Sequence, residues 1–105
     1  MYTIDKDKFY IIRTFSAGIW FAKVKEIIET PGNLLVTIIE ARNLWYYSGA
    51  HSLVQLAEEG VKNANNCKFT QVINDEVLLT QVTSILPCSD TATTNLQNVS
   101  VWKAK

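Results

Sequence analysis

The order of apolar and polar residues in the first third of the chain predicts β-strands. Beta-branched and aromatic residues dominate residues 9–13 and 19–24, which flank a short break at residues 14–18. Two such runs around a short break are typical of a β-hairpin. The second run continues to Thr30 and then meets Pro31, Gly32 and Asn33. A turn is expected there, since proline fixes one backbone dihedral angle and glycine supplies the unusual one.

The next two segments predict a central strand and a helix that covers the sheet. Residues 34–41 form a nearly continuous apolar run, as in a strand buried on both faces. After Ser52, apolar residues recur at the three-to-four spacing of one helical face. Ser52 and Gln55 have the spacing of a capping box, and Gly60 stands where a left-handed residue would end the helix.

The last third of the chain alternates less regularly. Residues 62–66 predict a loop and residues 67–72 a short extended piece, while residues 76–86 alternate as one further strand that ends at Pro87. Residues 89–98 are small and polar, and residues 99–102 are expected to return as an edge strand or docking arm. The pattern therefore predicts an α+β fold, with a small bent antiparallel sheet of four to five strands and one helix.

Length and composition predict a single domain and argue against polymeric nucleic acid as a partner. With 105 residues and 48% apolar composition, we expect a single domain over residues 1–105, with a flexible or docking tail from about residue 89. A formal net charge of zero argues against binding polymeric nucleic acid, which needs clustered basic residues. No apolar run is long enough for a membrane helix, and residues 1–8 lack the apolar stretch of a signal peptide. Cys67 and Cys88 lack metal or redox spacing, so buried thiols are expected.

Aromatic residues and arginines are distributed unevenly. Eight of the eleven aromatic residues lie between Phe9 and Tyr47, and the only two arginines, Arg13 and Arg42, lie among them. Rings stack on bases and a guanidinium pairs with phosphate oxygens, so this combination suits a nucleotide. Packing of the rings in the core is the alternative for any single residue. The triple Trp45, Tyr46 and Tyr47 favours exposure, because an extended chain sends neighbours to opposite faces.

A run of small residues follows the aromatic triple and opens the predicted helix. It consists of Ser48, Gly49, Ala50, His51 and Ser52. Free backbone N–H groups at a helix start can hold a phosphate, although helix capping alone also explains such residues. The break after Arg13 offers a second set of polar groups, in which Ser16 precedes Trp20.

Catalysis is the less favoured interpretation. His51 is the only histidine, and no metal-ligand set, nucleophile motif or acid–base pair of carboxylates accompanies it in the sequence. We therefore expect no catalytic residue, no metal ion and no cofactor. A degrading enzyme that uses His51 as acid or base remains an alternative hypothesis.

Several of these segments resemble a family of small, uncharacterised phage and prophage proteins. The similarity covers residues 9–21, 41–56 with Gly60, and 67–69, and it extends to a closing strand at residues 85–87. Its most specific parts are Leu-Trp-Tyr at residues 44–46 and Ser-Gly-Ala at residues 48–50. The chain departs from the family pattern at Ala22, Asn43 and Tyr47, where the family has glycine, a second basic residue and tryptophan.

That family in turn resembles viral sponge proteins that counter cyclic-oligonucleotide immunity (anti-CBASS). The resemblance implies a homo-oligomer, with a tetramer favoured, in the cytoplasm of the host bacterium. It would sequester a small cyclic nucleotide such as 3′,3′-cGAMP without cleaving it. Asn43 replaces a basic residue, and this replacement would weaken phosphate binding or change the preferred nucleotide.

The sequence thus predicts a nucleotide-binding surface whose residues are aromatic, basic or small and polar. A protein-interaction module that inhibits a host factor, and a structural role in the virion, are the other hypotheses. The expected ligand-binding residues are Arg13, Ser16, Trp20, Arg42, Trp45, Tyr46, Tyr47, Ser48, Gly49, His51 and Ser52.

Overall fold

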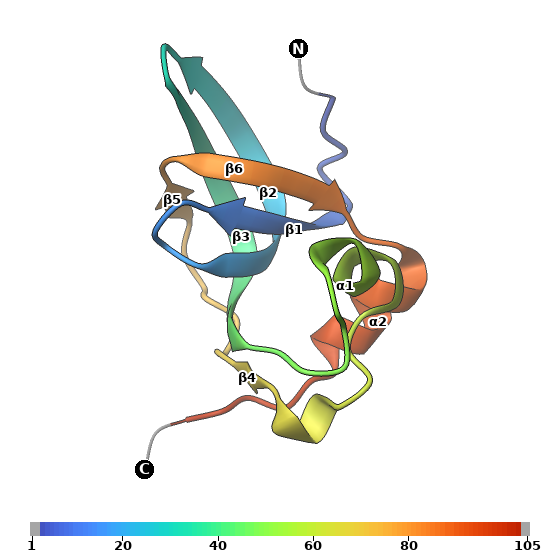
Figure 1. Ribbon diagram of the computed structural model, residues 1–105. Coiled ribbons are helices and arrows are strands. Elements are labelled where there is room, and N and C mark those ends of the chain that lie inside the picture. Colours follow the sequence, from blue (N-terminus) through green and yellow to red (C-terminus); the bar gives the residue numbers. More distant parts are fainter. Residues whose placement is uncertain (1–2, 104–105) are drawn as a thin grey trace.

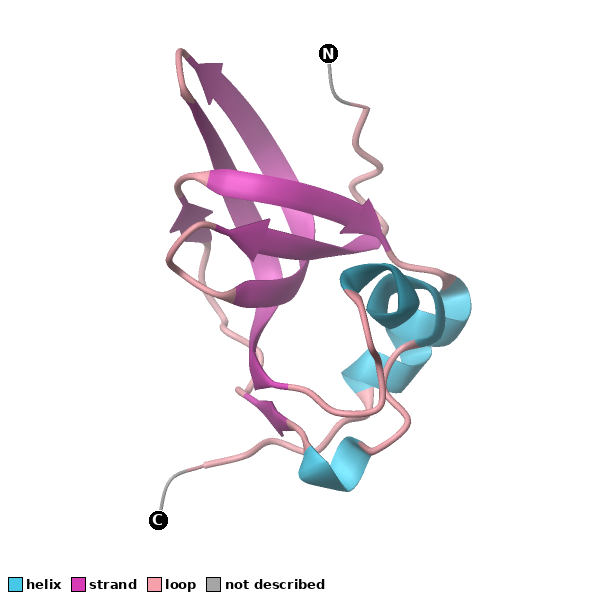
Figure 2. Ribbon diagram, viewed as in Figure 1, coloured by secondary structure: helices cyan, strands magenta, loops and turns pink. Residues whose placement is uncertain are grey.

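The protein has an α+β fold in which a six-stranded antiparallel open sheet packs against two α-helices (Figures 1 and 2). The computed structural model describes residues 3–103, and the predicted fold class is confirmed. The strand order is β4-β3-β2-β1-β6, and β5 lies off this path as a further partner of β3. In chain order the elements are β1 (Phe9–Thr14), β2 (Ile19–Thr30), β3 (Asn33–Tyr46), α1 (Leu53–Glu59), the 3-10 helix η1 (Ala64–Asn66), β4 (Lys68–Phe69), β5 (Val77–Leu79), β6 (Val82–Pro87) and α2 (Asp90–Gln97).

The predicted hairpins in the first half of the chain are confirmed. Strands β1 and β2 pair with Ile12 opposite Trp20, and β2 and β3 pair up to Thr30 opposite Asn33. Strand β3 extends five residues beyond its predicted end. It is bent by a β-bulge where Glu40 adopts a φ of 51°, a left-handed conformation that is uncommon for residues other than glycine.

The sheet buries apolar residues on both of its faces. We call the two sets the helix-side core and the sheet core. Phe9, Ile11 and Phe21 belong to the helix-side core, together with Leu56 of α1 and Leu96 of α2. The buried members of the sheet core come only from strands, and they are Tyr10, Ile12, Ala22, Val24, Val36, Ile38, Ala41, Leu79 and Val82. The curved sheet therefore covers its second face with its own strands.

Residues 76–86 form two strands, β5 and β6, where the alternation predicted one. Gln81 between them has a φ of 54°, which breaks the extended chain. Its N–H donates to Asn33 Oδ1 at 2.8 Å, and its carbonyl accepts from Phe15 N at 3.0 Å. As a result β5 pairs with β3 while β6 pairs with β1. The break at Gln81 thus lets β5 and β6 pair at opposite edges of the curved sheet.

The prediction of a single helix is corrected, because the polar segment after Ser89 forms α2. Ser89 Oγ accepts from Ala92 N at 3.0 Å and donates to the carbonyl of Glu58 at 2.5 Å. Only Ala92 and Leu96 of this helix are buried. A threonine-rich helix with two apolar residues gives a weak periodic signal. The cap and the contact with α1 therefore stabilise it in place of intrinsic propensity.

One asparagine joins the two helices. Asn95 of α2 accepts from Val61 N at 2.8 Å and donates to the carbonyl of Val61 at 3.0 Å. Gly60 ends α1, as predicted, with a φ of 78°, and a Cβ there would lie 2.3 Å from Asn95 Oδ1. Glycine at position 60 thus allows both the left-handed turn and the close approach of Asn95.

Residues 99–102 return to the sheet, as expected for a docking arm. Val101 forms a parallel bridge with Phe69, and Trp102 N donates to the carbonyl of Phe69 at 3.0 Å. Among residues 3–103, no helix is long and apolar enough to cross a membrane.

The variant Asn95→Asp is expected to lower the free energy of unfolding by about 2 kcal/mol, because the carboxylate cannot donate to the Val61 carbonyl and would face it. Urea denaturation measures the change. Thr94→Ala, on the exposed side of the same helix, is the control and should change the value by less than about 0.5 kcal/mol. Equal stability of the Asn95→Asp variant and the native protein would contradict this role.

Candidate functional site

Two tryptophans and a lysine form an exposed cluster at one end of the sheet, which we call the indole pair with Lys68. The rings of Trp45 and Trp102 stack with centroids 5.5 Å apart and planes 12° apart. They are 65% and 45% exposed. Lys68 Nζ lies 4.9 Å from the Trp45 centroid and 5.0 Å from that of Trp102. The ammonium group therefore bridges the two rings through cation–π contacts.

Three segments that are distant in the sequence build this cluster. Trp45 lies near the end of β3, Lys68 begins β4, and Trp102 belongs to the C-terminal arm. The backbone of Tyr46 pairs with that of Lys68 in the β3–β4 register. Because the arm hydrogen-bonds to Phe69 next to Lys68, the same short strand positions the ammonium and the second indole.

The charge of Lys68 is available to a ligand. Lys23, Lys25 and Lys62 each form an ion pair with a glutamate. Within residues 3–103, Lys68 has no carboxylate within ion-pair distance. A cation beside two exposed aromatic rings can contact an anion and a flat apolar group together.

Two of the three rings in the aromatic triple are exposed, in line with the expectation that at least one would lie outside the core. Trp45 is joined by Tyr46, which is 51% exposed, while Tyr47 packs against the helix-side core. The extended end of β3 therefore turns two rings toward solvent and the third inward.

Arg42 does not share this exposure. Its side chain is buried at 3% exposure, and Phe69 lies against its guanidinium at 5.2 Å. Nε donates to the carbonyl of Thr70 at 2.8 Å, and Nη1 donates to that of Leu96 at 2.9 Å. Burial lowers the pKa of this guanidinium. The structure thus uses Arg42 to join β3 to α2 and to the segment after β4.

The predicted residues of the β1–β2 turn lie on different faces of the sheet. Arg13 is exposed and pairs with Ile19, which packs on the helix-side core, whereas Trp20 packs on the sheet core. Trp20 Nε1 donates to the carbonyl of Ala17 at 3.1 Å, and Ser16 is exposed in the turn. The structure does not bring the Arg13 and Trp20 side chains to one face.

The run from Ser48 to Ser52 is largely occupied by contacts within the chain. Ser48 N donates to Cys67 Sγ, and His51 N donates to Gln55 Oε1. Ser52 caps α1 by accepting from Gln55 N at 3.1 Å, as predicted. A Cβ at Gly49 would lie 2.5 Å from the backbone nitrogens of Lys62 and Asn63. The close approach that glycine allows here is made by the chain's own backbone.

Sequence reasoning missed Lys68 and Trp102. Lys68 lies within residues 67–69, which belong to the family similarity. Trp102 lies within residues 99–102, for which an edge strand or docking arm is predicted. The stacking of Trp102 on Trp45 joins residues 57 positions apart, so no local pattern indicates it.

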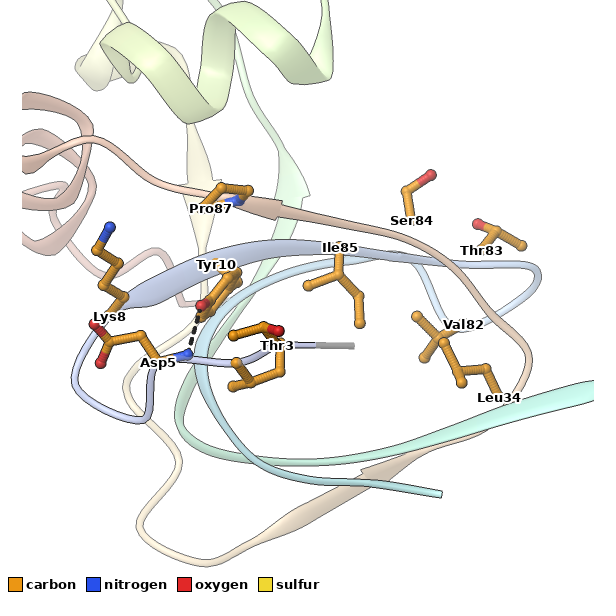
Figure 3. A pocket seen from close by; sticks show the side chains of 11 residues that line it. Thr3, Asp5, Lys8, Tyr10, Leu34, Val82, Thr83, Ser84, Ile85 and Pro87 are labelled. Atoms are coloured by element: carbon orange, nitrogen blue, oxygen red, sulfur yellow. Dashed lines mark hydrogen bonds between the residues drawn. The ribbon is translucent and has the colours of Figure 1, made fainter. Parts of the chain in front are cut away.

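A separate cavity lies away from this cluster, beneath the segment that precedes β1 (Figure 3). It has a volume of about 550 Å³. Asp5 and Lys8 lie at one end beside Tyr10, and Leu34 and Val82 lie at the other (Figure 3). The phenol oxygen of Tyr10 accepts from Asp5 N at 3.0 Å. This bond holds the N-terminal segment over the cavity.

Tyr10→Phe is expected to release that segment. The lost acceptor should lower the free energy of unfolding by about 1 kcal/mol, and hydrogen exchange at the Asp5 amide should become faster. Exchange measured by NMR checks the second effect. Tyr46→Phe, in an exposed ring, serves as control, and an unchanged Asp5 exchange rate in Tyr10→Phe would show that the bond does not hold the segment.

The two cysteines are buried, as predicted, and neither forms a disulfide. Burial, aided by the nearby charge of Glu58, raises the pKa of the Cys88 thiol to about 12. A thiol with so high a pKa is a poor nucleophile at neutral pH. Within residues 3–103, no three histidine, cysteine or acidic side chains gather as a metal site would require.

The raised pKa of Cys88 predicts a loss of stability at alkaline pH. The unfolded thiol ionises near pH 9 and the folded one near pH 12, so the unfolded chain loses its proton first and stability falls as pH rises above about 9. Thermal unfolding between pH 7 and pH 11 should therefore show a steeper decline for the native protein than for Cys88→Ala. Parallel declines in the two proteins would contradict the assignment.

The chain belongs to a family that is described as a domain of unknown function (DUF6948), whose profile matches residues 7–96. The match covers all described strands and nearly all of α2. No curated protein and no solved structure matches the chain.

Proposed function

We propose that this protein binds a small cyclic nucleotide at the indole pair with Lys68 and sequesters it without cleavage. The observation that carries the proposal is the pair of exposed, stacked indoles with an ammonium group 4.9 and 5.0 Å from their centroids. A base stacks on an exposed indole face, while the ammonium attracts a phosphate. Both groups of a nucleotide thus find a matching group within one small surface.

The phosphate role belongs to Lys68 in this proposal. Arg42 is held inside by two carbonyl groups, and its guanidinium stacks on Phe69. Lys68 instead is half-buried and has no acidic neighbour among the described residues at ion-pair distance. The cavity under residues 3–8 fits less well, because the charge of Asp5 accompanies that of Lys8 there.

A cyclic dinucleotide carries two bases and two phosphates, whereas one chain offers one such surface. Two copies of the chain related by a two-fold axis would supply a second indole pair and a second ammonium. A near-symmetric ligand such as 3′,3′-cGAMP fits between two equal surfaces of this kind. We therefore propose a homo-oligomer. The resemblance to anti-CBASS sponge proteins adds to this proposal a tetramer, a place in the cytoplasm of a host bacterium and a role in viral immune evasion.

Calorimetric titration with a panel of cyclic dinucleotides and cyclic ADP-ribose isomers tests the binding. Trp45→Ala is expected to weaken it about 5- to 150-fold, which corresponds to the loss of about 1 to 3 kcal/mol of base stacking. Lys68→Glu should weaken it further and reduce its dependence on salt. Lys6→Glu, which makes the same charge change on an exposed lysine away from the cluster, is the matched control.

Recovery of the ligand after heat denaturation separates sequestration from catalysis. Intact nucleotide is expected, whereas hydrolysed nucleotide would identify an enzyme. If no nucleotide of the panel binds, the proposal fails.

A protein-interaction module is the second candidate, and one observation favours it. Tyr46 and Val101, the chain neighbours of the two indoles, are 51% and 45% exposed and add exposed apolar residues to the same two segments. Tryptophan and tyrosine contribute strongly to protein interfaces. A complex with a purified host protein that is lost in Trp102→Ala, together with no nucleotide binding, would favour this second function.

A further inference from the structure

A second feature of the molecule, the buried guanidinium of Arg42, lacks a partner at one nitrogen. Nε and Nη1 donate to the carbonyls of Thr70 and Leu96, but Nη2 has no hydrogen-bond partner and is shielded from solvent. A buried N–H group without an acceptor costs about 1 to 3 kcal/mol, and more when it is charged. Such groups are therefore rare in folded proteins and point to a missing partner.

The buried charge of Arg42 also lacks a counter-charge. No carboxylate of residues 3–103 forms an ion pair with it. The two carbonyl acceptors and the ring of Phe69 offer only partial negative charge. Because a guanidinium stays protonated even when burial disfavours it, an anion would stabilise this position.

Arg42 lines a cavity of about 250 Å³ that is suitable for such an anion. Its base is formed by the buried residues Phe9, Phe21 and Arg42, and its rim by the exposed residues Glu40, Val72 and Gln97. The Glu40 carboxylate pairs with Lys23 Nζ at 3.1 Å, so a cation offsets its charge at the rim. Nη2 itself is shielded from solvent, so an anion in the cavity contacts it only when an exposed rim side chain changes rotamer.

We infer that this cavity binds a small oxyanion, such as a phosphate or carboxylate group, through Nη2 of Arg42. The anion supplies the missing acceptor and the missing charge together. Carbonyl groups already fix the other two nitrogens of this guanidinium. Little conformational entropy is therefore lost when an anion binds to it. This inference rests on the packing of Arg42 and is independent of the nucleotide proposal, which assigns its phosphate contact to Lys68.

Thermal unfolding and NMR titration with inorganic phosphate test the site. At constant ionic strength, phosphate at ten times its dissociation constant should raise the Tm of the native protein by about 6 °C relative to chloride. The Nε–H resonance of Arg42 and the backbone amides of Val72 and Gln97 should shift with the same dissociation constant. Parallel titrations with sulfate and acetate show whether the site prefers a tetrahedral or a planar oxyanion.

The variant Gln97→Glu places a carboxylate at the rim, where it repels an added anion and competes for Arg42. It should weaken phosphate binding at least about tenfold. Thr94→Glu introduces the same charge on the same helix outside the cavity lining and should leave the dissociation constant within about twofold. Arg42→Met removes the cation and should abolish the phosphate effect, but Gln97→Glu tests the site even where Arg42→Met does not fold.

The inference is overturned if phosphate, sulfate and acetate all fail to shift the Arg42 Nε–H resonance. It is also overturned if phosphate stabilises Gln97→Glu as strongly as the native protein. Loss of nucleotide binding in Lys68→Glu with phosphate binding retained would separate this cavity from the indole pair.

Discussion

A single sheet with two apolar faces is the constraint on which the rest of this structure depends. The two short helices cover one face, where Leu56 and Leu96 meet residues of β1, β2 and β3. The second face has no helix, so the strands must curve around it. Among residues 3–103, the bulge at Glu40 and the break at Gln81 are the two points at which a residue other than glycine has a positive φ. Each of them lets a strand change direction and pair with a new neighbour.

The pairing of β6 with β1 at one edge of the sheet also fixes the C-terminal part of the molecule. Because β6 pairs with β1, the chain after Pro87 leaves the sheet beside α1, and Ser89 can cap α2 while it contacts the end of α1. Helix α2 then places the Leu96 carbonyl against Arg42. The arm that follows it reaches β4 and the indole pair. The pairing of β6 with β1 therefore helps to position both the cavity at Arg42 and the indole pair with Lys68, the two surfaces that we propose bind ligands.

Local patterns predicted the parts of the fold whose causes are local. The β1–β2 and β2–β3 hairpins, the cap at Ser52 and the end of α1 at Gly60 depend on neighbouring residues, and all of them are confirmed. Helix α2 escaped prediction because its stability comes from contacts with α1. The break at Gln81 escaped because its support is Asn33, which lies 48 positions earlier.

The candidate sites show the same division. The alternation of an extended chain predicted at least one exposed ring in the aromatic triple, and Trp45 and Tyr46 are exposed while Tyr47 packs against the helix-side core. The burial of Arg42 did not follow, because its acceptors are backbone carbonyls at Thr70 and Leu96 that only the tertiary fold brings near. The contact of Lys68 with the indoles could not be predicted from local sequence either, because Trp102, one of the two rings, lies 34 positions later in the chain. Composition indicated aromatic and basic residue types, and the topology determines which of them lie together.

The docking of Trp102 has a practical consequence for anyone who handles this protein. Trp102, one half of the indole pair, lies in the C-terminal arm and outside both cores. Proteolytic cleavage between Val101 and Trp102 during preparation would remove that ring and leave every core contact in place. Such material would unfold at the same temperature as the intact chain but would lack one ring of the indole pair with Lys68. The intact mass of the protein should therefore be measured before a failure to bind nucleotide is interpreted.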